Sequence, residues 1–370
     1  METIHSITGL QDLCSFTTRS PIILCILFAI IVHNRDIELL RKCTLTKNHY
    51  IGLTIILSVI LSVVFFIYLP IEVDNHRPGN VLLLAVNAGF LAITLSCMVV
   101  TTLISITHWD SVLKQIETFS RFRHLLLLMI KRDFVTRYRR SVLGVLWSIL
   151  NPLLTMAIIT MVFALLFRDM GIENFPVYFL GGQLVFGFFS ESTAQAMASV
   201  TGGASIIKRI YLPKYIFPMS KVFSSLVNMG FSLIAFLFVF FITGVPLKWT
   251  MLLIPIPIIF LLIFCLGIGM LLSAMSVFFR DLSYIWGVGI MLLQFLTPIF
   301  YPASILPIRV FYLIHLNPLF HYVEYFRDLT LHGTIPNLWS NIICIGFAMA
   351  ALGLGVYVKL NKQDKYILYL

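Results

Sequence analysis

A cluster of basic residues that could bind a partner lies in the loop 201–221, between two long apolar runs. The loop contains no acidic residue, and its four cations are Lys208, Arg209, Lys214 and Lys221. Short loops rich in Lys and Arg face the cytoplasm in membrane proteins. We therefore expect this loop at the inner face of a membrane, where a soluble motor could push on it. An ordinary basic turn that only sets topology is the alternative.

A short helix that is both basic and apolar is expected inside this loop. Gly203 is suited to end the preceding helix, and Ser205 can cap a new one. The segment 206–212 is long enough for about two helical turns. Pro213 then disfavours continuing the helix.

Motifs for catalysis are missing from the chain. There is no glycine-rich phosphate loop followed by Lys-Ser or Lys-Thr, so we expect no ATP hydrolysis by this chain alone. A His-Glu-x-x-His motif and a nucleophile elbow are also absent, and the six cysteines are scattered without metal spacing. We therefore expect no catalytic residue, no metal site and no cofactor in this chain.

The composition places these residues in a membrane protein. The chain is 59% hydrophobic and 11% charged, with a mean hydropathy of +0.96. Several runs of about 20 apolar residues follow one another, and they do not alternate with polar residues as barrel strands do. An all-α polytopic fold is therefore expected. The net charge of +10 comes from loops and does not indicate nucleic-acid binding.

Three regions divide the chain. Residues 1–110 form an N-terminal extension with a transmembrane hairpin at 50–107, while a span at 20–32 is left open. Residues 111–143 form a linker and an amphipathic helix, and 144–370 form a core of six spans, which gives about eight spans in total. The proline-broken stretch 301–337 should form re-entrant or interfacial helices on the outer side. Lys and Arg concentrate in the inner segments, so both ends of the core, including the C-terminus, should be cytoplasmic.

An amphipathic helix is predicted just before the first core span. Its apolar residues recur at the spacing of one helix face: Leu127, Ile130, Phe134, Tyr138 and Val142. The opposite face carries Arg132, Asp133, Thr136, Arg139 and Arg140. Such a helix is expected to lie flat on the inner leaflet, and a solvated linker helix is the alternative.

Two features inside the apolar runs stand out. Pro152 follows Asn151 within the first core span and should kink it. Glu191 is the clearest acid within an apolar run, and an intramembrane carboxylate indicates a functional site by default. The interpretation that we favour is that Glu191 lies near the inner end of its span, is protonated or paired, and holds helices together.

Six short motifs carry a family resemblance. They are 131–147 (KRDFVTRYRRSVLGVLW), Asn151-Pro152, 210–214 (IYLPK), 279–282 (FRDL), 297–302 (TPIFYP) and 316–318 (LNP). Their order and spacing resemble the permease subunit of bacterial type-2 ABC exporters, in particular those for O-antigen, capsule and teichoic acid. The resemblance covers about two thirds of the chain and leaves out residues 1–110.

The resemblance implies a partnership and a cargo. It implies a homodimer of this chain with two copies of a separate ABC ATPase, which would hold ATP and magnesium. The complex would export a polysaccharide linked to undecaprenyl diphosphate across the bacterial inner membrane. The implied coupling helix at 206–213 would contact the ATPase through Ile206, Lys208, Arg209, Tyr211, Leu212 and Pro213.

The same resemblance implies an entrance and a path for the substrate. Cations of the amphipathic helix would meet the diphosphate: Lys131, Arg132, Arg137, Arg139 and Arg140. The channel would be lined by Tyr178, Phe186, Phe189, Tyr284, Trp286, Gln294 and Phe300, although interface belts and lipid-facing surfaces also hold such aromatics. One alternative is an exporter of a small lipid or drug. Another is a membrane-integral transferase acting on lipid-linked sugars, with candidate residues His315, His321, Glu324 and Asp328.

Overall fold

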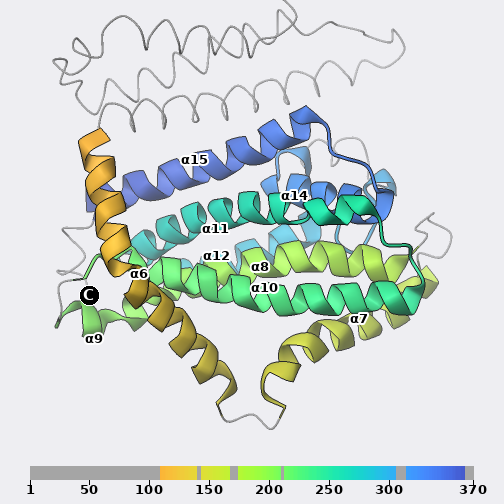
Figure 1. Cartoon of the computed structure of the whole chain (residues 1–370), viewed down its shortest axis with the longest axis horizontal. Helices are drawn as coiled ribbons and strands as arrows, with labels where there is room; N and C mark the ends of the chain where they lie inside the picture. The colour runs from red at the N-terminus through yellow and green to blue at the C-terminus, as the bar shows by residue number, and fades with distance from the viewer. Residues whose placement is uncertain (1–108, 140–142, 167–173, 210–211, 306–313, 363–370) are drawn as a thin grey trace, which may run out of the picture.

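A computed structural model describes residues 109–139, 143–166, 174–209, 212–305 and 314–362 of the chain (Figure 1). Every element in these ranges is helical, so the all-α prediction is confirmed there. The predicted hairpin at 50–107 and the open question at 20–32 lie outside the described residues.

Four long helices lie side by side and form the body of the molecule (Figure 1). They are α8 (Phe175–Gly202), α10 (Ile216–Thr243), α11 (Pro255–Ser276) and α15 (Leu338–Lys362). Helix α8 is central, because α10, α11 and the smaller helices at its ends all pack against it. Its aromatic side chains, such as Phe179 and Phe186, are almost fully buried in the main apolar core.

Four segments in the described ranges are long and apolar enough to span a membrane: Gly144–Phe163, Ile216–Thr243, Trp249–Ser276 and Trp339–Val358. Of the six predicted core spans, α8 and α12 (Leu282–Leu296) fall outside this set. Helix α8 is less apolar overall because it carries polar residues such as Glu191 and Gln195. Neighbouring helices cover α8, so those groups need not face lipid.

The remaining helices close the two ends of the bundle. At one end lie α14 (Pro318–Arg327), the π-helical turn η4 (Asp328–His332) and the 3-10 turn η2 (Trp249–Leu253). In the described parts of 301–337, η3 (Ala303–Ile305), α14 and η4 confirm that the proline-rich stretch forms short segments. Thr250 on η2 donates a 2.6 Å hydrogen bond to the carbonyl of Leu329, which ties η2 to η4.

The other end of the bundle carries α6 (Trp109–Tyr138) and the one-turn helix α9 (Ala204–Ile207). Helices α6 and α7 (Trp147–Leu166), which follows the short turn η1 (Gly144–Leu146), form a V beside α10 (Figure 1). A second apolar cluster gathers at this end, which we call the basal cluster. Its buried members are Leu126, Met129, Val200, Ile207, Ile216, Phe217, Ala274 and Val277, with Val358 of α15 packed against them.

Two local predictions need correction. The loop helix was expected at 206–212 with Ser205 as its cap, but α9 begins at Ala204 after Gly203 and ends at Ile207. It ends there because Ile207 is buried in the basal cluster while Lys208 and Arg209 turn out to solvent.

The face of α6 was also assigned incorrectly in part. Leu127, predicted on the apolar stripe, is 60% exposed, whereas its neighbour Leu126 is buried. Asp133, predicted on the polar face, is only 12% exposed and pairs with Lys221 of α10 at 2.8 Å. Phe134 does lie on the packed face, where it stacks on Phe231 of α10. The apolar stripe of α6 therefore packs against α10. The buried residues are shifted around the helix relative to the predicted ones.

Gly267 of α11 permits a close approach of two helices. A Cβ atom at Gly267 would lie 2.2 Å from the carbonyl carbon of Ala351, and one at Gly355 would lie 2.3 Å from the carbonyl oxygen of Gly267. These backbone approaches join α11 to α15 more tightly than any side chain would permit.

We expect Gly267→Ala to force α11 and α15 apart and to cost about 1–3 kcal/mol of stability, the usual range for overpacking. The measurement is the thermal aggregation midpoint of the detergent-purified protein. Gly230→Ala in α10 is the control, because a Cβ atom at that position would have no neighbour within 4 Å. Equal midpoints for the two variants would contradict the close packing.

Candidate functional site

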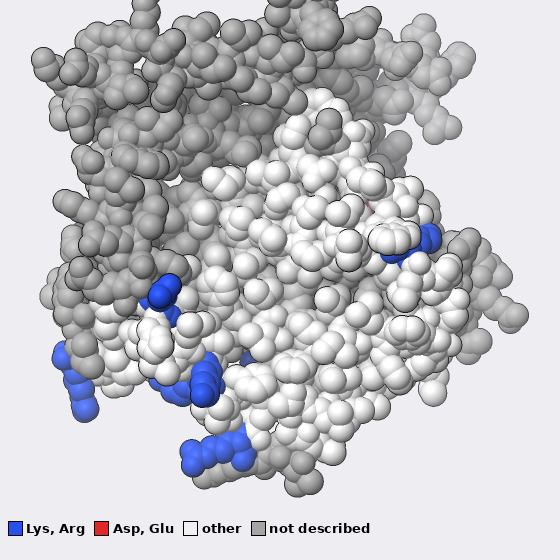
Figure 2. All heavy atoms as spheres, in the orientation of Figure 1, with Lys and Arg blue, Asp and Glu red and all other residues white. Residues whose placement is uncertain are grey.

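The loop around α9 exposes two cations directly after a buried isoleucine. Ile207 is 8% exposed and contacts the basal cluster, while Lys208 and Arg209 follow directly in an exposed turn. Figure 2 shows most Lys and Arg groups of the drawn face toward the end where α6 and α9 lie, with a largely uncharged surface over α10 and α11. We call Ala204–Arg209 the foot.

The residues predicted to contact the ATPase differ in how exposed they are. Ile206 is half-buried against the basal cluster, Lys208 and Arg209 are exposed, and Leu212 and Pro213 are half-buried. Tyr211 lies outside the described residues. The sequence analysis missed Ile207, which is the side chain that anchors the foot. The available signal was the pair of isoleucines just before the two cations.

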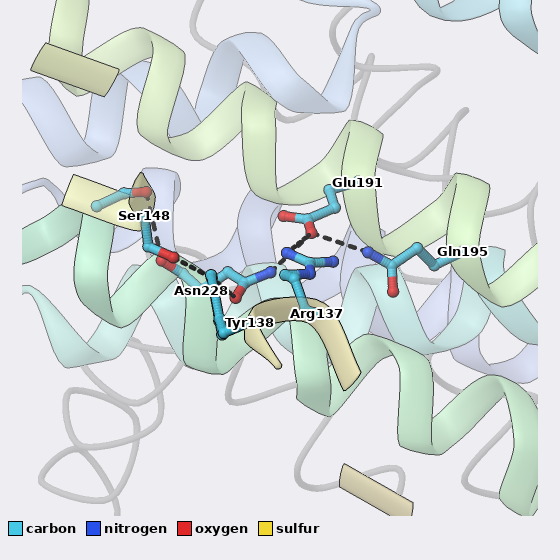
Figure 3. Close-up of polar contacts among 7 residues, drawn as sticks. Arg137, Tyr138, Ser148, Glu191, Gln195 and Asn228 are labelled. Carbon is cyan, nitrogen blue, oxygen red and sulfur yellow. Dashed lines mark hydrogen bonds and ion pairs between the residues drawn. The ribbon is translucent and has the colours of Figure 1, made fainter. Parts of the chain in front are cut away.

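A polar cluster lies at the middle of the bundle, where α6, α8 and α10 meet (Figure 3). The carboxylate of Glu191 accepts three contacts: from Arg137 at 2.7 Å, from Gln195 at 2.8 Å and from Asn228 at 2.7 Å. The interpretation that Glu191 is paired and holds helices together is therefore confirmed. Pairing is required because an isolated charge inside a membrane span is costly.

The cluster extends to α7 through Tyr138. Its hydroxyl contacts the hydroxyl of Ser148 and donates a 3.4 Å hydrogen bond to Oδ1 of Asn228. Arg137 and Tyr138 thus connect the end of α6 to three other helices. Pro152 lies inside α7, as predicted, one turn after Ser148.

A cleft of about 460 Å³ opens beside this polar cluster. Its walls come from α6, α7, α8 and α10, and its lining residues are Arg137, Tyr138, Trp147, Ser148, Asn151, Pro152, Glu191, Asn228 and Ser232. Arg137 and Glu191 are each about one third exposed, so both face the cleft as well as each other. Ser148 and Asn228 both lie in segments that are long and apolar enough to span a membrane.

The cations that were predicted to bind the diphosphate differ in whether a carboxylate already pairs with them. Arg132 lies 3.3 Å from Asp133, and Arg137 is held by Glu191. Lys131 and Arg139 are exposed, and no carboxylate in the described ranges lies within ion-pair distance of either. Arg140 lies outside the described residues.

The residues predicted to line a channel divide into two groups. Phe186 and Phe189 are each 2% exposed inside the main core, so a lining role does not fit them. Their rings are enclosed because α8 is the central helix; the ring of Phe189 contacts those of Phe264 and Trp286. The remaining predicted residues are at least partly exposed: Tyr178, Tyr284, Trp286, Gln294 and Phe300.

The contacts of Tyr178 reveal a buried cation that the sequence analysis did not single out. Arg327 of α14 is 4% exposed, and its guanidinium carbon lies 3.5 Å from the centroid of the Tyr178 ring. The same guanidinium approaches the carbonyls of Tyr178 and Ile299 at 3.4 and 3.5 Å. Arg327 therefore fastens α14 to α8 and to the end of α12.

The candidate residues for a transferase lie at the α14 end. His321 Nε2 lies 2.8 Å from the carbonyl of His315, and burial lowers the pKa of His321 to about 4. Asp328 is engaged with His332 at 3.0 Å. In the described part of the chain, no three His, Cys, Asp or Glu side chains gather as metal ligands.

A family model described as ABC-2 type transporter matches residues 124–331, which contain α7, α8, the foot, the polar cluster and α14. The chain belongs to the ABC-2 type transporter family.

Individual relatives of this ABC-2 transporter chain carry more specific names. An O-antigen export system permease protein RfbA of Klebsiella pneumoniae is 32% identical over 66% of this chain and 95% of its own length. The polysialic acid transport protein KpsM of Escherichia coli is 23% identical over 63% of this chain and 91% of its own. A capsule polysaccharide export inner-membrane protein CtrC of Neisseria meningitidis is 20% identical over 66% and 94%.

We expect Glu191→Ala to release the end of α6 from the ABC-2 bundle, because it leaves Arg137 and two amides without their acceptor. The expected cost is about 1–3 kcal/mol, since the pair is partly solvated. The measurement is hydrogen exchange of the backbone amides near Tyr138, which should become faster.

Glu191→Gln is the control, because its amide oxygen still accepts from Asn228 and its exchange should rise less. The double exchange Arg137→Glu with Glu191→Arg should restore protection. Unchanged exchange in Glu191→Ala would show that the pair does not hold α6.

Proposed function

We propose that this chain is the membrane permease of an ATP-driven exporter that moves a lipid-linked polysaccharide, such as O-antigen on undecaprenyl diphosphate, across a bacterial inner membrane. The observation that carries the proposal is the foot, which exposes Lys208 and Arg209 while Ile207 is buried among the helix ends. The named relatives support the cargo, because they are O-antigen, polysialic acid and capsule exporters.

The energy for transport comes from a separate ABC ATPase, which binds ATP with magnesium. The sequence contains no phosphate loop of its own, so the work must reach this chain through a contact surface. Two copies of the permease and two of the ATPase form the complex, and the foot of each permease meets one ATPase. Motion of the foot is transmitted because Ile207 belongs to an apolar cluster that also contains residues of α6, α8, α10 and α11.

The orientation follows from the distribution of charge. The end that carries α6 and α9 holds the exposed cations Lys208 and Arg209, so it faces the cytoplasm. The six core helices are α7, α8, α10, α11, α12 and α15, and α14 with η4 closes the outer side. With the N-terminal hairpin the chain crosses the membrane about eight times.

The entrance for the lipid-linked substrate lies along α6. Lys131 and Arg139 are exposed and unneutralised in the described ranges, so they are the cations best placed to bind a diphosphate. Arg137 is less suited, because Glu191 already neutralises it. The exposed apolar residues of α7 and α12, such as Met161 and Val288, suit contact with a second copy or with lipid.

The other candidate functions have less support. A small lipid or drug would also fit a type-2 exporter, but the named relatives move polysaccharides. A transferase would need a reactive cluster at the α14 end, and there His321 and Asp328 contact neighbouring groups of their own segment.

The test of the foot is the double charge reversal Lys208→Glu with Arg209→Glu. We expect at least a tenfold loss of co-purifying ATPase, because the contact surface changes sign, with membrane insertion unchanged. Arg280→Glu, an exposed cation in the turn between α11 and α12, is the control and should retain the ATPase. Normal co-purification of the double variant would overturn the proposal.

The test of the entrance is the pair Lys131→Ala and Arg139→Ala. Charge-assisted contacts to phosphate are worth about 1.5–3 kcal/mol, so each variant should raise the half-saturating concentration of lipid-linked substrate roughly tenfold or more. ATPase association should not change. Arg139→Lys keeps the charge and should recover most of the loss, whereas equal behaviour of all variants would contradict a diphosphate site on α6.

A further inference from the structure

The cleft between α6, α7, α8 and α10 has a polar lining. Its walls include one carboxylate, one guanidinium, two side-chain amides and several hydroxyls. Polar groups within membrane spans must be buried in protein or line a wet cavity. The volume of about 460 Å³ lies within the range of roughly 300–1,000 Å³ that is typical of sites for small ligands.

Part of this lining is explained by helix packing, and part is not. Arg137, Glu191, Asn228, Tyr138 and Ser148 contact one another in the polar cluster (Figure 3). The side-chain amide of Asn151 and the indole N–H of Trp147 make no hydrogen bond to any described residue, although both residues line the cleft. These two groups remain available for a ligand.

The charge of the cleft selects against a strong anion. Among the described residues of its lining, only Arg137 and Glu191 carry a full charge, and they lie 2.7 Å apart. An anionic ligand would gain attraction from Arg137 but would meet repulsion from Glu191 at nearly the same distance. The cleft is therefore better matched to a neutral ligand that both donates and accepts hydrogen bonds.

The tryptophan in the lining narrows the class of ligand further. Trp147 is 46% exposed and forms part of the wall beside Asn151, one helical turn away. An aromatic face combined with amides and a carboxylate matches a ring with an apolar face and hydroxyls around its edge. Sugar rings have this chemistry.

We propose that the cleft is a sugar-binding subsite that holds one neutral residue of the exported glycan, with Trp147 against the ring face and Asn151 and Glu191 on its hydroxyls. The proposal rests on the proposed function and adds a site to it. The diphosphate binds the exposed cations of α6, and the first sugars enter the cleft at the end of the same helix.

The experiment uses the assembled transporter, permease with ATPase, in lipid nanodiscs. The probe is the oligosaccharide repeat unit released by mild acid from the surface polysaccharide of the source bacterium, titrated while tryptophan fluorescence is recorded. We expect a saturable change that is lost in Trp147→Phe and kept in Trp339→Phe, which alters a partly exposed tryptophan on α15.

A second pair of variants tests the hydrogen bonds. Asn151→Ala should weaken oligosaccharide binding at least tenfold, whereas Thr136→Ala, an exposed polar residue of α6 outside the lining, should leave it unchanged. Inorganic pyrophosphate should not displace the oligosaccharide. Absent saturation, equal affinity in the Asn151 and Thr136 variants, or displacement by pyrophosphate would each overturn the sugar site.

Failure of this site is distinguishable from failure of the proposed function. Deleting the gene for this chain should abolish surface polysaccharide, and unchanged surface polysaccharide would refute the export function itself. If deletion removes the polysaccharide while the cleft variants bind the oligosaccharide normally, the export function stands and only the sugar subsite is rejected.

Discussion

The packing of Ile207 among the helix ends is the contact on which the account of this transporter depends. Without it, Lys208 and Arg209 would lie on a loop that could move independently of the bundle. With it, the foot shares a single apolar cluster with residues of α6, α8, α10 and α11. Close-packed interiors transmit displacement because they deform little. In the proposed coupling, a push on Lys208 and Arg209 would therefore act on all four helices.

The second constraint is the cost of polar groups inside a membrane. Two charged side chains that the structure describes inside the bundle have partners: Glu191 is bound by Arg137 and two amides, and Arg327, at the α14 end, by carbonyls and the Tyr178 ring. These contacts join helices that are distant in sequence. They also explain how α8 can be the central helix without being the most apolar one, since other helices shield its polar residues from lipid.

The sequence was informative where chemistry is local. Gly203 at the end of α8 and Pro318 at the start of α14 act through backbone geometry, and the structure confirms both boundaries. The sequence was less informative where the neighbouring helix decides which residues of a helix are buried. The apolar stripe of α6 was evident, but its phase depended on α10, which buries Leu126 and Asp133 instead of Leu127. Phe186 and Phe189 suited a channel by residue type, yet the position of α8 at the centre of the bundle encloses them.

The most direct test of the account measures polysaccharide exported per ATP hydrolysed by the reconstituted complex carrying Ile207→Ala. This variant keeps Lys208 and Arg209 but leaves a cavity beneath the foot, so the ATPase should still bind and hydrolyse ATP while export per ATP falls at least fivefold. An unchanged ratio would contradict the claim that the buried isoleucine transmits work to the bundle.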